Sequence, residues 1–441
     1  MRRRKYKYFA FLCILVYTYY FFGIHDYLNT KDFDETFNYP LNIDLNKVAK
    51  RILGGEKPGV TPINYYPYRF LTNSAKCGTV DQMDLFIVVK SAMNHFGHRM
   101  AIRKTYGQED VIPGKIVKTL FFLGVERKKT LLQNVVDKEI DEYKDIIQMN
   151  FIDNYYNNTI KTMMSFRWVY EHCSTADFYL FTDDDMYISV KNLLDYVNKP
   201  VVTENPLLER DRNTYMSKLN ELEEDKYKLH FSKPHKLDNS KEFENKFEQD
   251  RDRSNLDLQE LKKDSKIDIS KFLTGVNLIP KRKRDRSQTK QVLERERYND
   301  IITNAMELKR DTYFYAGYVF KSAPLRLISS KWRVSLEEYP WNRWPDYVTA
   351  GAYTLSNKAM KTMYVASLFV KHFKFDDIYL GIVAKKLGIK PVHCADFYYY
   401  KKIYTKDAYK DVIASHGFAD HEELLRVWYE QNGNGRMLPS P

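Results

Sequence analysis

Cysteine is scarce in this sequence, and no spacing of cysteine or histidine typical of a zinc site is present. Four cysteines occur in 441 residues, and there is no C-x-x-C motif, so nothing predicts a zinc-binding module. Cys13 lies in an apolar run, which leaves Cys77, Cys173 and Cys394 for at most one disulfide. The sequence does not decide which two of these three thiols would pair.

Charge is absent from residues 8–24, the run YFAFLCILVYTYYFFGI. At about 1.5 Å per residue, this run is at the short end of the length that spans a bilayer as a helix. Residues 1–7 are rich in arginine and lysine, so the positive-inside rule predicts a cytosolic tail at 1–7, a transmembrane signal anchor at 8–24 and a lumenal body. A cleaved signal peptide is the alternative, although no small-x-small cleavage site follows the run.

The chain carries a net charge of +12, and 44% of its residues are hydrophobic. The hydrophobic content excludes a disordered chain. The positive charge would suit nucleic acid, a membrane surface or an anionic substrate. Because the predicted body is lumenal, we expect no nucleic-acid partner.

Strand and helix patterns alternate from residue 83 onward, after a mixed polar and apolar segment at 25–82 that predicts a stem. Short runs rich in aromatic and β-branched residues at 83–92, 118–125 and 177–182 predict strands, and 159–173 predicts a helix. Alternation of this kind predicts an α/β fold with a parallel sheet. Ligands of such sheets bind beyond the carboxyl ends of the strands.

Residues 201–310 have a different composition, dense in charges of both signs and poor in large apolar residues. We expect a solvated, largely disordered insertion there. Its basic run KRKRDR at 281–286 allows an alternative function as a polyanion-binding protein. The ordered pattern returns over 311–432, and 433–441 is a terminal tail.

Two groups of carboxylates stand out in the ordered segments. Asp183, Asp184 and Asp185 directly follow the strand that ends at 182, in FYLFTDDDMYISV. Adjacent carboxylates suit a hard divalent cation, which could neutralise a diphosphate leaving group; capping of the next helix is the alternative. The pair Asp376 and Asp377 lies in an apolar setting, where burial could raise a pKa towards general-base work, or it could begin a helix.

Other candidates are less specific when taken alone. Arg99 and Arg103 in HRMAIRKTYG suit a pyrophosphate or a solvated helix face, and His416 alone would be an ordinary surface histidine. Trp341 and Trp344 suit either core packing or stacking on a sugar ring. The triplet at Asn157 is an acceptor sequence for N-glycosylation.

Several blocks, taken in order, resemble the β1,3-glycosyltransferases of galactosyltransferase family 31. They are VVKSA, RMAIRKTYG, FFLG, FYLFTDDDMYISVKNLL, YVTAGAYTLS, FDDIYLGIVAKKLGI and VIASHGF. The resemblance implies a GT-A fold, with a nucleotide-sugar-binding half at 83–200 and an acceptor-binding half at 311–432. It also implies a type II membrane protein of the Golgi apparatus with UDP-GlcNAc as donor and Mn²⁺ as cofactor.

The reaction implied is an inverting β1,3 transfer of N-acetylglucosamine to a β-mannosyl or galactosyl acceptor, on a glycosphingolipid. UDP-galactose is the alternative donor, and a non-catalytic glycan-binding protein is the alternative of another class. Carried over by the resemblance, the site residues are Asp377 with Asp376 for catalysis, Asp185 and His416 for the metal, Ser91, Arg99, Arg103, Asp183 and Asp184 for the nucleotide sugar, and Trp332, Trp344, Tyr347 and Gly351 for the acceptor.

Overall fold

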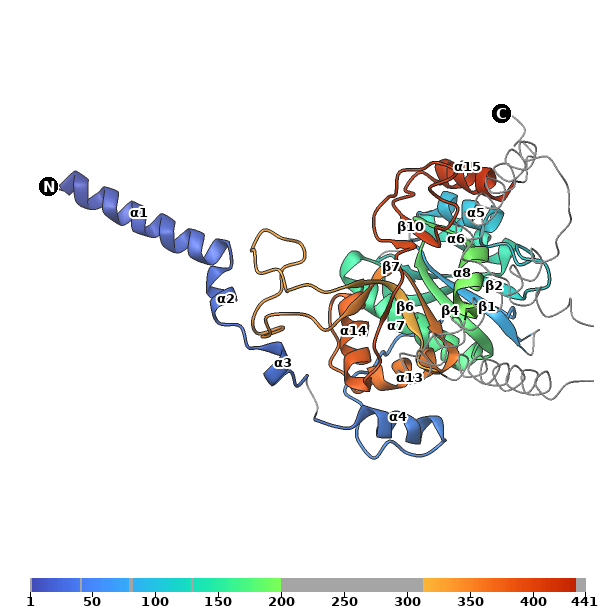
Figure 1. Ribbon diagram of the computed structural model, residues 1–441, viewed down its shortest axis with the longest axis horizontal. Coiled ribbons are helices and arrows are strands. Elements are labelled where there is room, and N and C mark those ends of the chain that lie inside the picture. Colours follow the sequence, from blue (N-terminus) through green and yellow to red (C-terminus); the bar gives the residue numbers. More distant parts are fainter. Residues whose placement is uncertain (1, 40–41, 79–81, 128–130, 200–311, 434–441) are drawn as a thin grey trace, which may run out of the picture. The chain divides into compact units, whose positions relative to one another are not determined.

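A computed structural model describes residues 2–39, 42–78, 82–127, 131–199 and 312–433 (Figure 1). All of them belong to one compact unit. The predicted insertion at 201–310 lies entirely outside the described residues, and so does the tail after residue 433.

The centre of this unit is a seven-stranded sheet in the order β3-β2-β1-β4-β7-β6-β8. Its neighbours from β3 to β4 are parallel, whereas β7 runs antiparallel to both β4 and β6. This confirms the predicted α/β class, although the sheet is mixed and is wholly parallel only from β3 to β4. The strands are β1 (Met83–Lys90), β2 (Val117–Val125), β3 (Ile146–Ile152), β4 (Ala176–Asp183), β6 (Tyr315–Phe320), β7 (Tyr347–Ser356) and β8 (Val392–His393).

Helices cover both faces of the sheet, which is why the central strands are continuous apolar runs. In β1, Phe86 and Val88 face one hydrophobic core, while Ile87 and Val89 face the other. The first core is closed by α4 (Leu45–Leu53), α7 (Asn158–His172), α13 (Asn357–Ser367) and α14 (Asp376–Leu387). The second is closed by α5 (Phe96–Lys104), α6 (Leu131–Tyr143), α8 (Val190–Asn198) and α15 (His421–Asn432).

A smaller sheet of three strands stands at the end of β4. It has the order β5-β10-β9 and consists of β5 (Met186–Ile188), β9 (Phe397–Tyr398) and β10 (Ala414–His416). Since β5 follows β4 directly and pairs antiparallel with β10, this sheet brings the segment around residue 416 to the aspartates at 183–185.

The predicted stem at 25–82 is not a separate spacer, because it packs on the central sheet. Its elements are α2 (Ile24–Leu28), α3 (Phe33–Thr36) and α4, and Phe33, Leu45 and Val48 are buried in the first core. The side-chain amide of Asn64 donates to the carbonyl of Ser367 at 2.7 Å. The stem prediction is therefore wrong for this segment. Its apolar and polar residues alternate irregularly, so the sequence alone did not identify the apolar ones as core residues.

A disulfide joins Cys77 to Cys173, at the carboxyl end of α7. It ties the segment before β1 to the helix that covers one face of the sheet. Cys394 is buried and free, and Cys13 is exposed and free. The structure thus selects one of the three pairings that the sequence left open.

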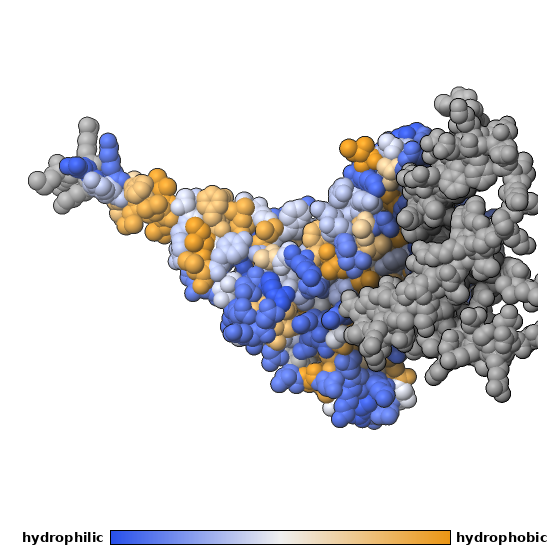
Figure 2. Space-filling view, viewed as in Figure 1, coloured by the Kyte–Doolittle hydropathy of each residue, from blue (hydrophilic) through white to orange (hydrophobic). Residues whose placement is uncertain are grey.

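The transmembrane helix predicted at 8–24 is not found in that form. Helix α1 (Arg2–Phe21) ends before Gly23, which has a φ of +70° and approaches Arg326 so closely that a Cβ would lie 2.6 Å from its Cβ. Apolar side chains gather along α1 (Figure 2). Nevertheless, none of the helices in the described ranges is sufficiently long and apolar to cross a membrane.

Candidate active site

The three consecutive aspartates lie where β4 ends, and the fold gives each a different environment. Asp183 is the last residue of β4 and pairs in register with Lys90, the last residue of β1. The side chain of Asp183 is 35% exposed, that of Asp184 is 8% exposed and that of Asp185 is 30% exposed. Asp183 and Asp185 therefore face solvent, and Asp184 points into the protein.

Asp184 fastens the loop between β1 and α5. Its carboxylate accepts a hydrogen bond from the Ser91 hydroxyl at 2.6 Å and lies 2.9 Å from Nδ1 of His95. Burial acts to raise the pKa of Asp184, but the hydrogen bond and charge of His95 bring the pKa below its ordinary value. Ser91 and Asp184, both predicted to bind the nucleotide sugar, thus contact each other.

Asp185 meets His416, although 230 residues separate them in the chain. Nε2 of His416 lies 3.2 Å from Oδ2 of Asp185, because β10 places His416 opposite Met186 of β5. The interaction with Asp185 raises the pKa of His416. The structure brings the two predicted metal ligands together, and their binding of a metal stays a prediction.

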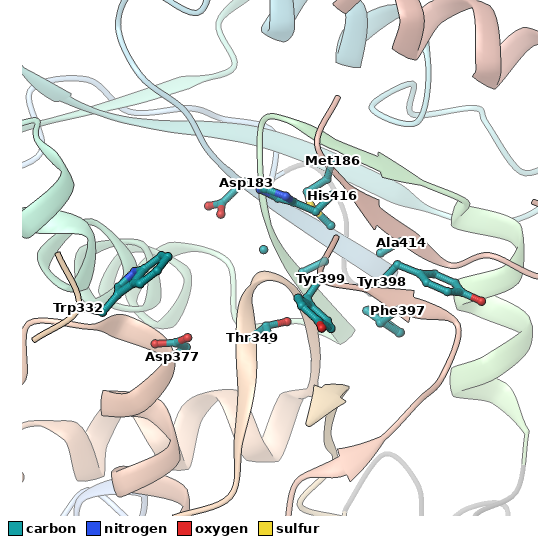
Figure 3. A pocket seen from close by; sticks show the side chains of 12 residues that line it. Asp183, Met186, Trp332, Thr349, Asp377, Phe397, Tyr398, Tyr399, Ala414 and His416 are labelled. Atoms are coloured by element: carbon teal, nitrogen blue, oxygen red, sulfur yellow. The ribbon is translucent and has the colours of Figure 1, made fainter. Parts of the chain in front are cut away.

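A pocket of about 300 Å³ opens beside these residues (Figure 3). Asp183 and His416 lie at one side of it, and Trp332 and Asp377 lie at another. Its remaining lining comes mainly from β5, β7, β9 and β10: Met186, Thr349, Gly351, Ala352, Phe397, Tyr398, Tyr399 and Ala414. The predicted donor end and the predicted catalytic end therefore share one pocket.

The carboxylates Asp376 and Asp377 begin α14 but have different surroundings. Asp376 is buried; its Oδ2 accepts from Nζ of Lys90 at 2.9 Å and from the Thr162 hydroxyl at 2.7 Å. Burial alone would raise the pKa of Asp376, yet the Lys90 charge and these bonds bring it below its ordinary value. Since Asp376 does not line the pocket, the structure does not support direct contact with a substrate.

Asp377 is the member of the pair that faces the pocket. Burial, reinforced by the negative charge of Asp376, raises the pKa of Asp377 to about 7. Within the described part of the chain Asp377 forms no ion pair, and its Oδ1 accepts from the Ile378 amide at 2.7 Å. A half-buried carboxylate with a pKa near neutrality can take up a proton from a substrate.

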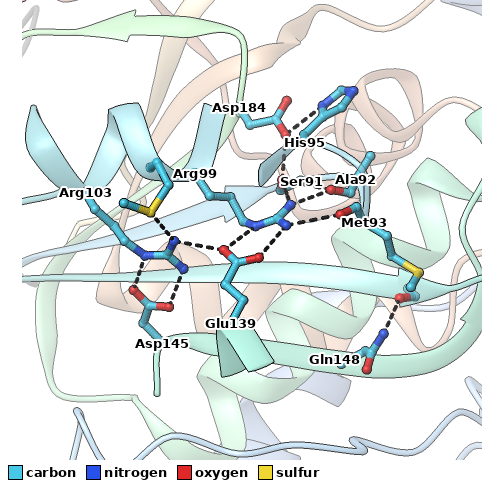
Figure 4. A network of polar contacts seen from close by, with 12 residues as sticks. Ser91, Ala92, Met93, His95, Arg99, Arg103, Glu139, Asp145, Gln148 and Asp184 are labelled. Carbon is cyan, nitrogen blue, oxygen red and sulfur yellow. Dashed lines mark hydrogen bonds and ion pairs between the residues drawn. The ribbon is translucent and has the colours of Figure 1, made fainter. Parts of the chain in front are cut away.

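The two predicted pyrophosphate ligands, Arg99 and Arg103, form ion pairs with carboxylates inside the protein (Figure 4). Arg99 is fully buried, with Glu139 at 2.6 Å and hydrogen bonds to Ser91 and to the carbonyls of Ala92 and Met93. The guanidinium of Arg103 pairs with Asp145 and Glu139, both at 2.8 Å. Their predicted contact with the nucleotide is therefore wrong: Arg99 supports the loop that carries Ser91, and Arg103 supports Glu139.

The predicted acceptor residues separate into two groups. Trp332 is 49% exposed and lines the pocket, where its indole N–H donates to the Tyr155 hydroxyl at 3.0 Å. Gly351 also lines the pocket, and a Cβ there would lie 3.3 Å from Sδ of Met186. These two positions are compatible with acceptor binding.

Trp344 and Tyr347 are not part of the pocket. Trp344 is 5% exposed and packs on Tyr339 and Phe373, with ring centroids 4.2 and 5.5 Å apart, so its predicted acceptor contact is wrong. The Tyr347 hydroxyl lies 3.0 Å from that of Ser322, and its ring stacks on Phe320. Trp341 is likewise a core residue. Of the two alternatives for Trp341 and Trp344, core packing is therefore the one observed.

Asn157 precedes α7 as its N-cap residue and is half-buried. Its side-chain amide donates to the carbonyl of Ile152 at 2.7 Å, and Thr159 is buried completely. Glycosylation at Asn157 stays a prediction.

Sequence reasoning missed Lys90, His95 and Tyr399. A lysine that ends an otherwise apolar buried strand could have drawn attention to Lys90, since a buried ammonium needs acidic partners. His95 stands in a loop after that strand, and Tyr399 follows β9; nothing in the local sequence distinguishes either from a surface residue.

The fold and the pocket together define an α/β protein with a candidate catalytic pocket. Its pocket lies at the carboxyl ends of parallel strands, the usual ligand-binding edge of such sheets, and holds a carboxylate of raised pKa. A sequence model of the galactosyltransferase family matches residues 97–243 and 295–395 of this chain.

Individual proteins are similar over most of the chain. The β1,3-galactosyltransferase brn of Drosophila melanogaster is 31% identical, over 92% of this chain and 90% of its own length. Mouse β1,3-galactosyltransferase 1 is 24% identical over 85% of this chain and 82% of its own length, and human β1,3-galactosyltransferase 5 is 24% identical over 80% and 81%. The chain belongs to the galactosyltransferase family and is a glycosyltransferase, which confirms the resemblance inferred from its motifs.

Proposed function

We propose that this enzyme transfers N-acetylglucosamine from UDP-GlcNAc to the 3-hydroxyl of a β-mannosyl or galactosyl acceptor, on a glycosphingolipid, with inversion at the transferred carbon. The observation that carries the proposal is the position of Asp377: it faces the pocket that Asp183 and His416 also line. A base there and a donor-binding edge opposite are what a single displacement requires. The relatives are named as β1,3-galactosyltransferases, which supports the β1,3 linkage.

Asp185 and His416 are the residues that would hold Mn²⁺. A carboxylate oxygen and an imidazole nitrogen 3.2 Å apart suit this ion. In the described residues no group of three or more histidine, cysteine, aspartate or glutamate side chains is gathered as a metal site, so further ligands would be substrate oxygens or water. When bound, the ion would compensate the charge of the diphosphate leaving group.

Asp377 and Trp332 are the residues that act on the acceptor. Asp377 takes the proton of the attacking hydroxyl, the new bond from that oxygen to the donor sugar forms, and the bond from the sugar to the diphosphate breaks, so UDP leaves with the electron pair. Trp332, half-exposed and held by Tyr155, offers a flat face on which a sugar ring stacks. Asp376 and Lys90 are buried behind Asp377 and bind no substrate.

The donor sugar is tested with a panel of UDP-sugars. The soluble lumenal part of the chain is incubated with Mn²⁺, each donor and β-mannoside or β-galactoside acceptors, and the product linkage is determined. We expect a preference for UDP-GlcNAc and a β1,3 product. UDP-galactose is the competing donor, because the similar proteins are named galactosyltransferases, and a preference for it would overturn the GlcNAc proposal.

We propose, further, that the catalytic domain lies in the lumen of the Golgi apparatus. The Cys77–Cys173 disulfide supports this, since disulfides persist in oxidising compartments. Expression in animal cells followed by glycosidase treatment is the test: a mobility shift that disappears in Asn157→Gln would support both the lumenal location and the glycosylation site. A chain that remains with cytosolic markers after fractionation would contradict the location.

A further inference from the structure

Lys90 is a buried cation between the two carboxylate clusters of the site. Its side chain is 4% exposed, and its Nζ lies 3.0 Å from Oδ1 of Asp183 and 2.9 Å from Oδ2 of Asp376. It also donates to the carbonyl of Ala350 at 3.3 Å, next to the pocket residue Gly351. One ammonium group therefore contacts β4, β7 and α14 at the end of β1.

The three contacts join parts of the site that no other ion pair of the described residues connects. Asp183 belongs to the donor edge, by which we mean the end of β4 where the proposed UDP-sugar would bind. Asp376 belongs to the first turn of α14, directly before Asp377. A buried carboxylate without a cation is costly, so Lys90 is needed to keep Asp376 ionised. With Lys90 in place, the orientation of the first turn of α14 is tied to the ends of β1 and β4.

We propose that Lys90 is a positioning residue for sugar transfer: by binding Asp183 and Asp376 at once, it holds Asp377 at the pocket facing the donor edge. The inference rests on the proposed function, in which Asp377 is the base. Lys90 touches no substrate in this scheme. It fixes the distance between Asp183 and Asp376, and it places a positive charge beside the carboxylate of Asp376.

Charge gives this role a signature that a merely structural lysine would lack. The titratable groups that surround Asp377 electrostatically or share its pocket, besides Lys90, are Asp376 of α14, Asp183 of β4, Tyr155 of the turn at Tyr155–Asn157, Tyr315 of β6, Tyr347 and Tyr353 of β7, Tyr398 of β9 with Tyr399 after it, and His416 of β10. Lys90 is the cation that lowers the pKa of Asp377, and Asp376 is the neighbour that raises it. Replacing Asp376 with Asn removes the charge that raises the pKa of Asp377, so this change should lower that pKa, whereas replacing Lys90 removes a cation and also favours the neutral form of Asp376.

The test compares Lys90→Met, Lys90→Arg and Asp376→Asn with the unmodified full chain, once the unmodified chain has shown transfer. Lys118→Met is the matched control, since Lys118 is a largely buried lysine of the neighbouring β2 that pairs with Glu109 away from the pocket. Each variant is measured for thermal unfolding, UDP binding with Mn²⁺ by calorimetry, and kcat and KM for the acceptor as a function of pH.

For Lys90→Met we expect kcat to fall on the order of 10²-fold, the loss typical of a misplaced reacting group, with UDP affinity within about threefold of the original. The rising limb of the pH–rate profile reports the ionisation of the base Asp377. Lys90→Arg, which keeps the charge, should recover part of kcat, and Asp376→Asn should move the limb to lower pH. The Lys118→Met control should keep both its rate and its profile.

A Lys90→Met enzyme with kcat within threefold of the original, or with UDP affinity reduced as much as kcat, would overturn the inference. If Lys90→Met does not fold, Asp376→Asn decides, because Lys90 then keeps Asp183 as its partner; a limb that stays in place or moves to higher pH overturns it. These results are distinct from a failure of the proposed function, in which the unmodified chain transfers no sugar.

Discussion

Asp376 and Asp377 are adjacent residues of identical type, and only their surroundings separate their roles. Asp376 lies against Lys90 and Thr162 and is buried. Asp377 faces the pocket, and its pKa is raised to about 7. At the scale of single residues, function here follows from which carboxylate has a cation and which has access to the pocket.

Replacing Asp377 with Asn should lower the rate of transfer by about 10²–10⁴-fold, because the amide keeps the shape of the side chain but cannot accept the proton. UDP affinity should change little, since the donor edge is formed by other residues. Asp185→Asn should instead weaken Mn²⁺-dependent UDP binding as well as turnover. Calorimetry and rate measurements on both variants are the check; equal loss of UDP binding in the two would contradict this division of roles.

The pH dependence follows from the raised pKa of Asp377. The base works only when ionised, so activity should be low well below pH 7 and should rise through about pH 7 to a plateau. An ordinary aspartate would instead be ionised above about pH 4. The measurement is kcat/KM for the acceptor between pH 5 and 9, with thermal unfolding at each pH to confirm that the protein stays folded; a flat profile from pH 5 upward would exclude Asp377 as the titrating base.

At the scale of elements, the loop between β1 and α5 is held in place by side chains of several elements. Arg99 of α5 donates to Ser91 and to two loop carbonyls while pairing with Glu139 of α6. Ser91 in turn donates to Asp184 after β4. The arginine motif therefore reaches the donor edge indirectly, through the loop that it supports.

Glu139→Gln should destabilise the protein by about 3–5 kcal/mol, because it leaves the buried Arg99 without its counter-charge. The matched control is Glu171→Gln, which breaks the partly exposed pair of Glu171 with Arg167 in α7 and should cost less than about 1 kcal/mol. Denaturant unfolding of both variants measures the difference. Equal effects would mean that the Arg99–Glu139 pair contributes no more than a surface ion pair.

At the scale of the whole molecule, the segment before β1 belongs to the catalytic domain. Phe33, Leu45 and Val48 close the core on the face covered by α7, α13 and α14, and the disulfide at Cys77 fastens the segment to α7. A chain without this segment would leave an apolar face of the domain exposed to water.

A fragment that begins at residue 83 and is directed into the secretory pathway should therefore fail to be secreted as a folded protein, whereas one that begins at Ile24 should be secreted and should unfold cooperatively. Secreted yield and thermal unfolding of the two fragments are the measurements, with Cys77→Ser in the longer fragment to isolate the disulfide. That single change should cost about 2–5 kcal/mol. Efficient secretion of the shorter fragment would show that residues 24–82 are dispensable for folding.

The sequence by itself determined the family, the α/β class and part of the pocket lining, because these depend on local patterns and on motifs. Apolar strands on either side of a helix predict a parallel sheet, and carboxylates after a strand predict a ligand edge. Asp183 and Asp185 follow from this strand pattern, whereas Asp377, His416, Trp332 and Gly351 came from the family resemblance; all six lie at or beside one pocket.

Only the tertiary structure decided which of several residues of similar type face the pocket and which support their neighbours. Arg99 and Trp344 have residue types suited to a ligand, but one is enclosed by Glu139 and the Ser91 loop and the other by Tyr339 and Phe373. Lys90 acquires its role from Asp376, 286 positions later in the chain. Burial and ion pairing depend on residues brought together from distant positions, and it is these that set the pKa of each carboxylate and decide whether a charged group faces the substrate or supports its neighbour.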